Sequence, residues 1–285
     1  MPSTIVLSRF RGLDAIELLA PDGASATVLL HGGHLVSWIP AGSREQLYLS
    51  PKSGFAVGQA IRGGVPVIFP QFNTRGPLQR HGFARNKVWQ PLSARQETDG
   101  ALAVLQLRDD AASHASWPQA FALELRVSVN AGTLEIAMSC ENTGDSPLQF
   151  TGALHTYLRV DALDATGLHG LGGLRYWDAV AGTTQVQREE WLQPGGDLDR
   201  VYYSVQRDLL LREACGPQER RLQIHQRGFD DAVVWNPGME KCAALADMPP
   251  DGYRHMLCVE AARIAHPVQL APRERWAGLQ KLTLL

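Results

Sequence analysis

Short runs of alternating apolar and polar residues, separated by turn-forming segments, extend along most of this 285-residue chain. Residues 121–129 alternate in this way, and Asn130, Ala131 and Gly132 lead into a second alternating run at residues 133–140. Two such runs joined by a three-residue, glycine-containing loop predict a β-hairpin. Further strands are expected at residues 26–30, 101–107, 148–160, 200–205, 221–226, 231–235 and 255–261.

Helical patterns are few. Residues 208–215 are expected to form a short helix before Gly216 and Pro217, and no longer segment shows a 3.6-residue period. Strands that alternate with helices are absent, which argues against Rossmann folds and TIM barrels. No linker-like segment divides the chain. We therefore expect an all-β fold, an antiparallel sandwich formed as a single domain by residues 1–285.

Composition excludes several classes of function. The net charge of −2 argues against general nucleic-acid binding, and no segment has the roughly 20 apolar residues of a membrane helix. The N-terminus lacks the pattern of a secretory signal, and the four cysteines include no CxxC pair. Cys140 and Cys258 lie in apolar runs, where free thiols act as small hydrophobic groups. We expect a reduced, cytoplasmic monomer that binds neither nucleic acid nor membranes.

Two titratable residues lie on segments that otherwise suit a sheet interior. In the first, residues 150–160, alternate positions form an apolar face, and His155 belongs to the opposite, more polar face. His155 is therefore expected to point into a cleft or solvent. Glu260 shares its face with Met256, Cys258 and Ala262, so desolvation should raise its pKa toward neutral pH. The two residues are candidates for an acid/base pair.

Two arginine-bearing segments could bind an anionic or polyhydroxylated ligand. Arg62 precedes two glycines that permit a tight turn and close approach of a ligand, but a surface arginine beside a structural turn would look the same. Arg80, His81 and Arg85 cluster around Gly82, although a solvated charged loop is the alternative.

Asp199 precedes a predicted strand and could accept hydrogen bonds from sugar hydroxyls or cap a turn. His31 and His34 have the spacing of a metal pair but no companion ligands, so no metal site is expected. The chain has no GxSxG elbow, phosphate loop or GxGxxG fingerprint. Among the seven tryptophans, Trp38 or Trp235 could stack on a sugar ring, although core packing is the simpler interpretation.

Taken together and in order, several segments resemble the aldose 1-epimerase superfamily, and most closely its hexose-6-phosphate mutarotase branch, the glucose-6-phosphate 1-epimerases. The resemblance implies a galactose-mutarotase-like β-supersandwich without a cofactor. It also implies that His155 and Glu260 are catalytic and that Arg62, Arg85 and Asp199 bind the ligand. Where some relatives have glutamine, this chain has Arg80. The matching segments are residues 33–38, 62–66, 81–86, 154–157, 199–202, 234–237 and 258–260.

The expected reaction interconverts the α and β anomers of an aldohexose 6-phosphate, with the sugar phosphate as the only partner. Arg80 and His81 are added to the expected substrate-binding residues because they neighbour Arg85 in the same loop. Three alternatives stay open: a mutarotase of an unphosphorylated aldose, a carbohydrate-binding protein without turnover, and a structural β-sandwich. Retention of both His155 and Glu260 favours an enzyme, because binding alone needs neither an acid nor a base.

Overall fold

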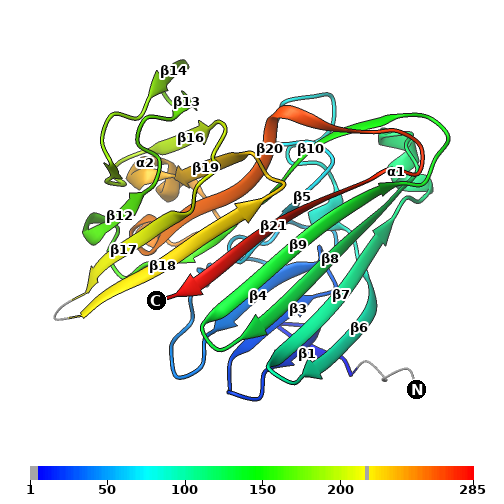
Figure 1. Ribbon diagram of the computed structural model, residues 1–285, viewed down its shortest axis with the longest axis horizontal. Helices are drawn as coiled ribbons and strands as arrows, with labels where there is room; N and C mark the ends of the chain where they lie inside the picture. Colours follow the sequence, from blue (N-terminus) through cyan, green and yellow to red (C-terminus); the bar gives the residue numbers. More distant parts are fainter. Residues whose placement is uncertain (1–5, 216–217) are drawn as a thin grey trace.

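The computed structural model describes residues 6–215 and 218–285, which form three antiparallel β-sheets (Figure 1). The largest has the strand order β15-β12-β17-β18-β21-β9-β8-β7-β6. Its strands are β6 (Gln90–Glu97), β7 (Gly100–Arg108), β8 (Phe121–Asn130), β9 (Thr133–Asn142), β12 (Thr166–His169), β15 (Trp191–Leu192), β17 (Leu209–Cys215), β18 (Gln218–Arg227) and β21 (Arg275–Leu284).

The second large sheet has eight strands in the order β14-β13-β16-β19-β20-β10-β5, and β11 pairs separately with β20. Its strands are β5 (Val67–Ile68), β10 (Leu148–Leu154), β11 (Tyr157–Arg159), β13 (Arg175–Asp178), β14 (Thr183–Val186), β16 (Leu198–Tyr202), β19 (Asp231–Asn236) and β20 (Met256–Leu270). A smaller sheet contains β1 (Ser8–Phe10), β2 (Leu13–Leu19), β3 (Ser25–Leu29) and β4 (His34–Ile39).

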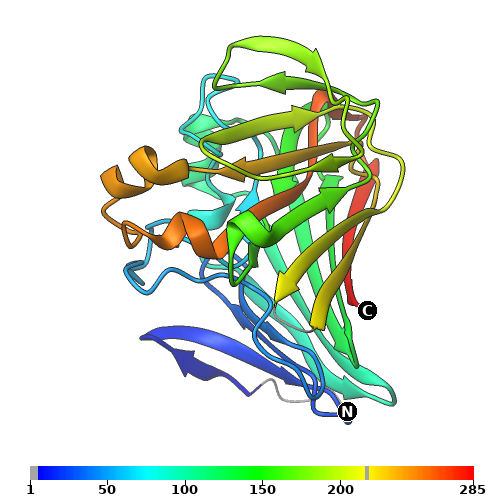
Figure 2. The same ribbon diagram turned by 90° about the vertical axis from the view of Figure 1, so that its left-hand side faces the viewer.

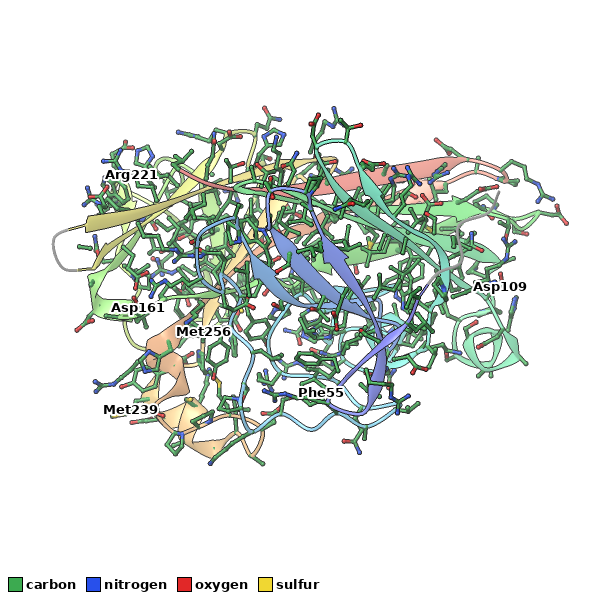
Figure 3. All side chains as sticks on the ribbon, turned by 90° about the horizontal axis from the view of Figure 1, so that it is seen from below. Phe55, Asp109, Asp161, Arg221, Met239 and Met256 are labelled. Carbon is green, nitrogen blue, oxygen red and sulfur yellow. The ribbon has the colours of Figure 1, made fainter. Side chains whose placement is uncertain are left out.

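One apolar core joins all three sheets. It includes Val28 of β3, Leu125 of β8 and Leu154 of β10, each at most 1% exposed. Alternation along the strands directs these side chains to the inner faces, as in other sandwiches. Side chains fill the space between the layers in Figure 3, where Met256, at the start of β20, lies inside and Met239 lies at the periphery. The predicted antiparallel sandwich is confirmed.

The helices are short: α1 (Ala111–Ser116), α2 (Gly238–Ala244) and the 3-10 turns η1 (Ala84–Asn86), η2 (Leu163–Ala165) and η3 (Gly252–His255). In the part of the chain that the structure describes, no helix has the length and apolar character needed to cross a bilayer. In Figure 2, α2 projects from the eight-stranded sheet on the side away from the nine-stranded sheet. Loops between residues 50 and 90 cover the same side (Figure 2).

The prediction of a short helix at residues 208–215 is wrong. Leu209–Cys215 forms β17, which pairs with β12 and β18. Leu209, Leu211 and Glu213 are buried while Arg212 and Ala214 are exposed, so the segment has the two-residue period of a strand. Ladder pairing on both sides therefore outweighs the helical preference of a leucine-rich sequence. Gly216 and Pro217 lie outside the described residues.

The hairpin between β8 and β9 is confirmed, but its loop is shorter than predicted. Asn130 pairs with Thr133, so Ala131 and Gly132 alone form the turn. Ala131 adopts a positive φ of 37°, which fits the backbone twist of tight two-residue hairpins. Cys140 in β9 and Cys258 in β20 are buried free thiols, as expected from their apolar surroundings.

Candidate active site

A cavity of about 270 Å³ lies on the side of the eight-stranded sheet that the loops cover. Strands β16, β19 and β20 and the break between β10 and β11 supply its sheet side, while segments around residues 60–85 and 245–247 supply the rest. All seven residues expected from the sequence to form the site line this one cavity. They are Arg62, Arg80, His81, Arg85, His155, Asp199 and Glu260.

His155 enters the cavity because it lies on the face of residues 148–160 opposite the apolar one. The register with β20 continues across the gap between β10 and β11, since Leu154 pairs with Ala261 and Tyr157 with Cys258. β10 ends at Leu154 and β11 begins at Tyr157, and the His155 backbone N–H donates to Pro66 O at 3.0 Å. The apolar face of this segment packs in the core, as predicted. The opposite face is covered by the loops, so His155 is 9% exposed and points into the cavity rather than into the core.

Glu260 lies within the first third of β20, opposite Val233 of β19, and is 1% exposed. Its Oε1 atom is 3.3 Å from His155 Nε2, which brings the two residues into direct contact. Glu260 Oε2 and His155 Nδ1 have no hydrogen-bond partner among the described residues. Buried polar atoms are normally paired, so each of these atoms is a strong candidate for contact with a ligand.

Burial moves the two pKa values in opposite directions. Desolvation, with a smaller contribution from the Asp199 carboxylate, raises the pKa of Glu260 well above 4.5, against the opposing charge of Arg80. Desolvation also lowers the pKa of His155 well below 6.5, and His81, Arg85 and Arg62 lower it further. The raised pKa of Glu260 agrees with the sequence analysis. The pair therefore favours one shared proton, held by the carboxyl group, over two separated charges.

Arg62 is held by two neighbours. Its Nε atom donates to Asp247 Oδ2 at 3.2 Å, Nη2 forms an ion pair with the same oxygen at 3.1 Å, and Nη1 donates to the Tyr157 hydroxyl at 3.1 Å. The two glycines after it have positive φ angles, and a Cβ atom on Gly64 would lie 2.3 Å from Leu35 O. Glycine is therefore required here for close approach of the protein's own backbone.

Arg85 contrasts with Arg62, because no carboxylate pairs with it among the described residues. The Nη2 atom of Arg85 donates to Arg80 O at 3.0 Å, and its buried Nε has no partner among the described residues. Burial lowers the pKa of Arg85, and Arg62 and Arg80 add to this effect. The guanidinium group stays charged, since its pKa is normally above 12. Arg85 is thus an uncompensated cation on the cavity wall.

His81 packs edge-on against His155, with ring centroids 5.6 Å apart. It adopts a positive φ of 67°, which is unusual for a residue with a Cβ atom. Burial, together with the charges of Arg85, Arg80 and Arg62, lowers the pKa of His81 to about 3. His81 is therefore a neutral hydrogen-bonding group in the cavity.

Asp199 reaches the cavity from β16, and burial raises its pKa despite the nearby positive charge of Lys241. Tyr157 and Asp247 are among the lining residues that the sequence did not predict as site residues. Tyr157 stacks on the His155 ring at 4.8 Å, and its place two residues along the same strand face was a usable signal. Asp247 has no such signal, because it comes from a loop far away in the sequence. Trp235, which was considered as a stacking residue, also lines the cavity.

His31 and His34 have structural roles. His31 Nε2 is 2.8 Å from Gln59 O, and His34 Nε2 is 2.7 Å from Gly63 O. Each ring therefore donates to a backbone carbonyl group, and burial lowers the pKa of His34 to about 4. The His34 contact also fixes the backbone next to Arg62.

The sequence profile of the aldose 1-epimerase family matches residues 14–283. The chain belongs to this family. The chain is 35% identical to an Escherichia coli K12 protein over 279 residues, and the match covers 96% of this chain and 92% of the relative. It is 32% identical to a Cenchrus ciliaris protein over 282 residues, covering 94% and 83%. Both relatives carry the name "Putative glucose-6-phosphate 1-epimerase".

A solved structure supports the same family assignment for this chain. The crystal structure of "a putative mutarotase (YeaD)" from Salmonella typhimurium superposes with a TM-score of 0.90 at 30% identity, covering 99% of this chain and 94% of that one. The mutarotase fold expected from the resemblance is confirmed.

Proposed function

We propose that this protein is a glucose-6-phosphate 1-epimerase, which interconverts the α and β anomers of the sugar phosphate. The contact of His155 with Glu260 at 3.3 Å, in a cavity that also contains Arg62, Arg80 and Arg85, carries the proposal. Opening a cyclic hemiacetal needs a base at the C1 hydroxyl and an acid at the ring oxygen. These two oxygens are bonded to the same carbon, so the acid and the base must be neighbours.

Glu260 as carboxylate takes the proton from the C1 hydroxyl, while His155 as imidazolium donates one to the ring oxygen. The bond between C1 and the ring oxygen breaks and the C1 carbonyl forms. Rotation about the C1–C2 bond presents the other face of the aldehyde, and the reverse transfers close the ring. General acid and general base transfers are each worth about 10²–10⁴-fold in rate.

The shifted pKa values determine which of the two residues holds the proton before the reaction begins. An ordinary histidine titrates near neutral pH, but burial and nearby cations lower the pKa of His155. A neutral histidine beside a protonated Glu260 holds the same number of protons as the reactive ion pair. One transfer across the 3.3 Å contact therefore converts the resting pair into the reactive pair. Ring opening then restores the neutral pair that burial favours.

The arginines support a phosphorylated substrate. Asp247 already compensates the charge of Arg62, whereas Arg85 has no carboxylate partner among the described residues. A 6-phosphate group would neutralise Arg85 and the neighbouring Arg80, and Arg62 would contact it as a member of a neutral pair. Guanidinium groups match phosphate oxygens in geometry as well as charge. Asp199 is suited to accept hydrogen bonds from sugar hydroxyls.

The test is a panel of freshly dissolved free and phosphorylated aldoses, each followed by polarimetry. Glucose 6-phosphate should show the largest acceleration of mutarotation, and equal acceleration of glucose would contradict the role of the phosphate. In Arg85→Ala, kcat/KM for glucose 6-phosphate should fall about 10–100-fold, the value of a lost charged hydrogen bond. The rate with glucose should change much less.

A further inference from the structure

We propose that the active site also binds a zinc ion, held by His155, Cys258 and Glu260, which blocks catalysis. Each residue offers one ligand atom, and these three atoms lie within 4.8 Å of one another. Cys258 and Glu260 are alternate residues of β20 and so share one face of the strand. His155 reaches the same point from the break before β11, whose Tyr157 is the register partner of Cys258.

The geometry is close to what zinc requires. Bonds of 2.0–2.3 Å in a tetrahedral site place ligand atoms roughly 3.3–3.8 Å apart. The separation of 3.3 Å between His155 Nε2 and Glu260 Oε1 already meets this requirement. The thiol lies within 4.8 Å of the other two ligand atoms, so it needs a shift of at most about 1.5 Å to reach these separations. Glu260 Oε2, buried and without a partner among the described residues, is a second oxygen available to the ion.

The donor set selects the kind of metal. Sulfur, imidazole and carboxylate ligands together suit zinc, whereas magnesium and calcium prefer oxygen ligands alone. Coordination deprotonates a thiol, so Cys258 and Glu260 would supply two negative charges to the dication. Asp199 in the same cavity and the Asp247 partner of Arg62 reduce the repulsion from the arginines.

His155 and Glu260 are the residues to which the proposed function assigns acid and base catalysis. A zinc ion on both would remove the base and the acid together, so zinc should inhibit mutarotation. This inhibition rests on the proposed function, but the binding of the metal does not. Catalytic zinc sites also have three protein ligands with one open position, and here that position would face the cavity.

Cobalt(II) titration, followed by absorption, tests the site directly. The wild-type protein should bind one Co²⁺ ion with a thiolate-to-cobalt charge-transfer band, and Zn²⁺ should abolish the band. Cys258→Ala should lose the band and weaken Co²⁺ binding about tenfold or more, and His155→Ala should weaken it to a similar extent. Cys242→Ala is the matched control, because Cys242 is buried in the same apolar cluster as Cys258 but is not one of the three ligands.

Circular dichroism spectra like that of wild type would establish that each variant is folded. Absence of the band in wild type, or its persistence in Cys258→Ala, would overturn the proposal. The zinc concentration that halves the mutarotation rate should rise about tenfold or more in Cys258→Ala. A protein that accelerates mutarotation but shows no band would retain the proposed function and lose the metal site. A protein that shows the band but does not accelerate mutarotation would retain the metal site and lose the proposed function.

Discussion

At the scale of single residues, the active site depends on a carboxyl group placed where a sheet normally has an apolar side chain. Glu260 occupies an interior position of β20 and is 1% exposed. Desolvation makes an isolated buried charge costly, so the group retains a proton and contacts His155. The chemistry and the energetic cost therefore arise from the same feature, the placement of Glu260.

The pH dependence of the reaction should show the shared proton. His155 has a lowered pKa, so a second proton binds to the pair only below pH 6.5, and the raised pKa of Glu260 delays loss of the first proton. We expect kcat at saturating glucose 6-phosphate to stay constant as pH crosses 6.5. The pH dependence of kcat is the right measurement because it reports pKa values in the enzyme–substrate complex. An inflection at the ordinary histidine pKa would contradict the single shared proton.

Replacement of Glu260 by glutamine should make the protein increasingly stable relative to wild type as pH rises. A group whose folded-state pKa is raised contributes stability below its unfolded pKa, near 4.5, and loses it as pH rises toward the folded value. The free energy of unfolding of Glu260→Gln, relative to wild type, should therefore increase by up to about 1.4 kcal/mol per pH unit above pH 4.5. Urea denaturation from pH 5 to 8 measures this difference. Parallel curves for the two proteins would show that Glu260 is not desolvated.

At the scale of elements, strand pairing and tight turns bring the functional side chains together. The pairing of β10 and β11 with β20 sets His155 across from Glu260, and the glycines after Arg62 let that segment pass against Tyr48 and Leu35. Regular strands were predictable from alternation, as β8 and β9 show. The paired residues of β17 carry a helix-like composition, and only the neighbouring strands decide their conformation.

Gly64→Ala should disrupt the Arg62 segment. The added Cβ atom would lie 2.3 Å from Leu35 O and 2.9 Å from His34 Nε2, in addition to the strain of a φ of +62°. We expect at least about 2 kcal/mol of destabilisation, measured by urea denaturation, and a raised KM for glucose 6-phosphate. Gly58→Ala is the control, because Gly58 has a φ of +83° but no atom within 4 Å of the added Cβ. Equal effects in the two variants would exclude close packing as the cause.

At the scale of the whole molecule, segments far apart in sequence meet on one side of one sheet. His155, Glu260 and the arginine loops could be selected as candidates from residue type and from the order of the motifs. Their common cavity could not be derived, because it depends on how β20 pairs with β10, β11 and β19. Asp247 shows this limit clearly. No local pattern marks it, and only the fold places it beside Arg62.

The organisation of residues 1–285 as a single domain stays a prediction. The core that contains Val28, Leu125 and Leu154 is shared by all three sheets, so no sheet should unfold alone. Circular dichroism and tryptophan fluorescence should therefore report one coincident transition in urea. Two separated transitions would indicate independently folding units.

The central claim is that His155 and Glu260 act together on one hemiacetal. The most direct test is exchange NMR of equilibrated α- and β-glucose 6-phosphate, which measures interconversion without a coupling enzyme. Wild-type protein should accelerate the exchange, and His155→Ala and Glu260→Gln should each reduce that acceleration by about 10²–10⁴-fold while remaining folded. Exchange at the wild-type rate in either folded variant would contradict the account.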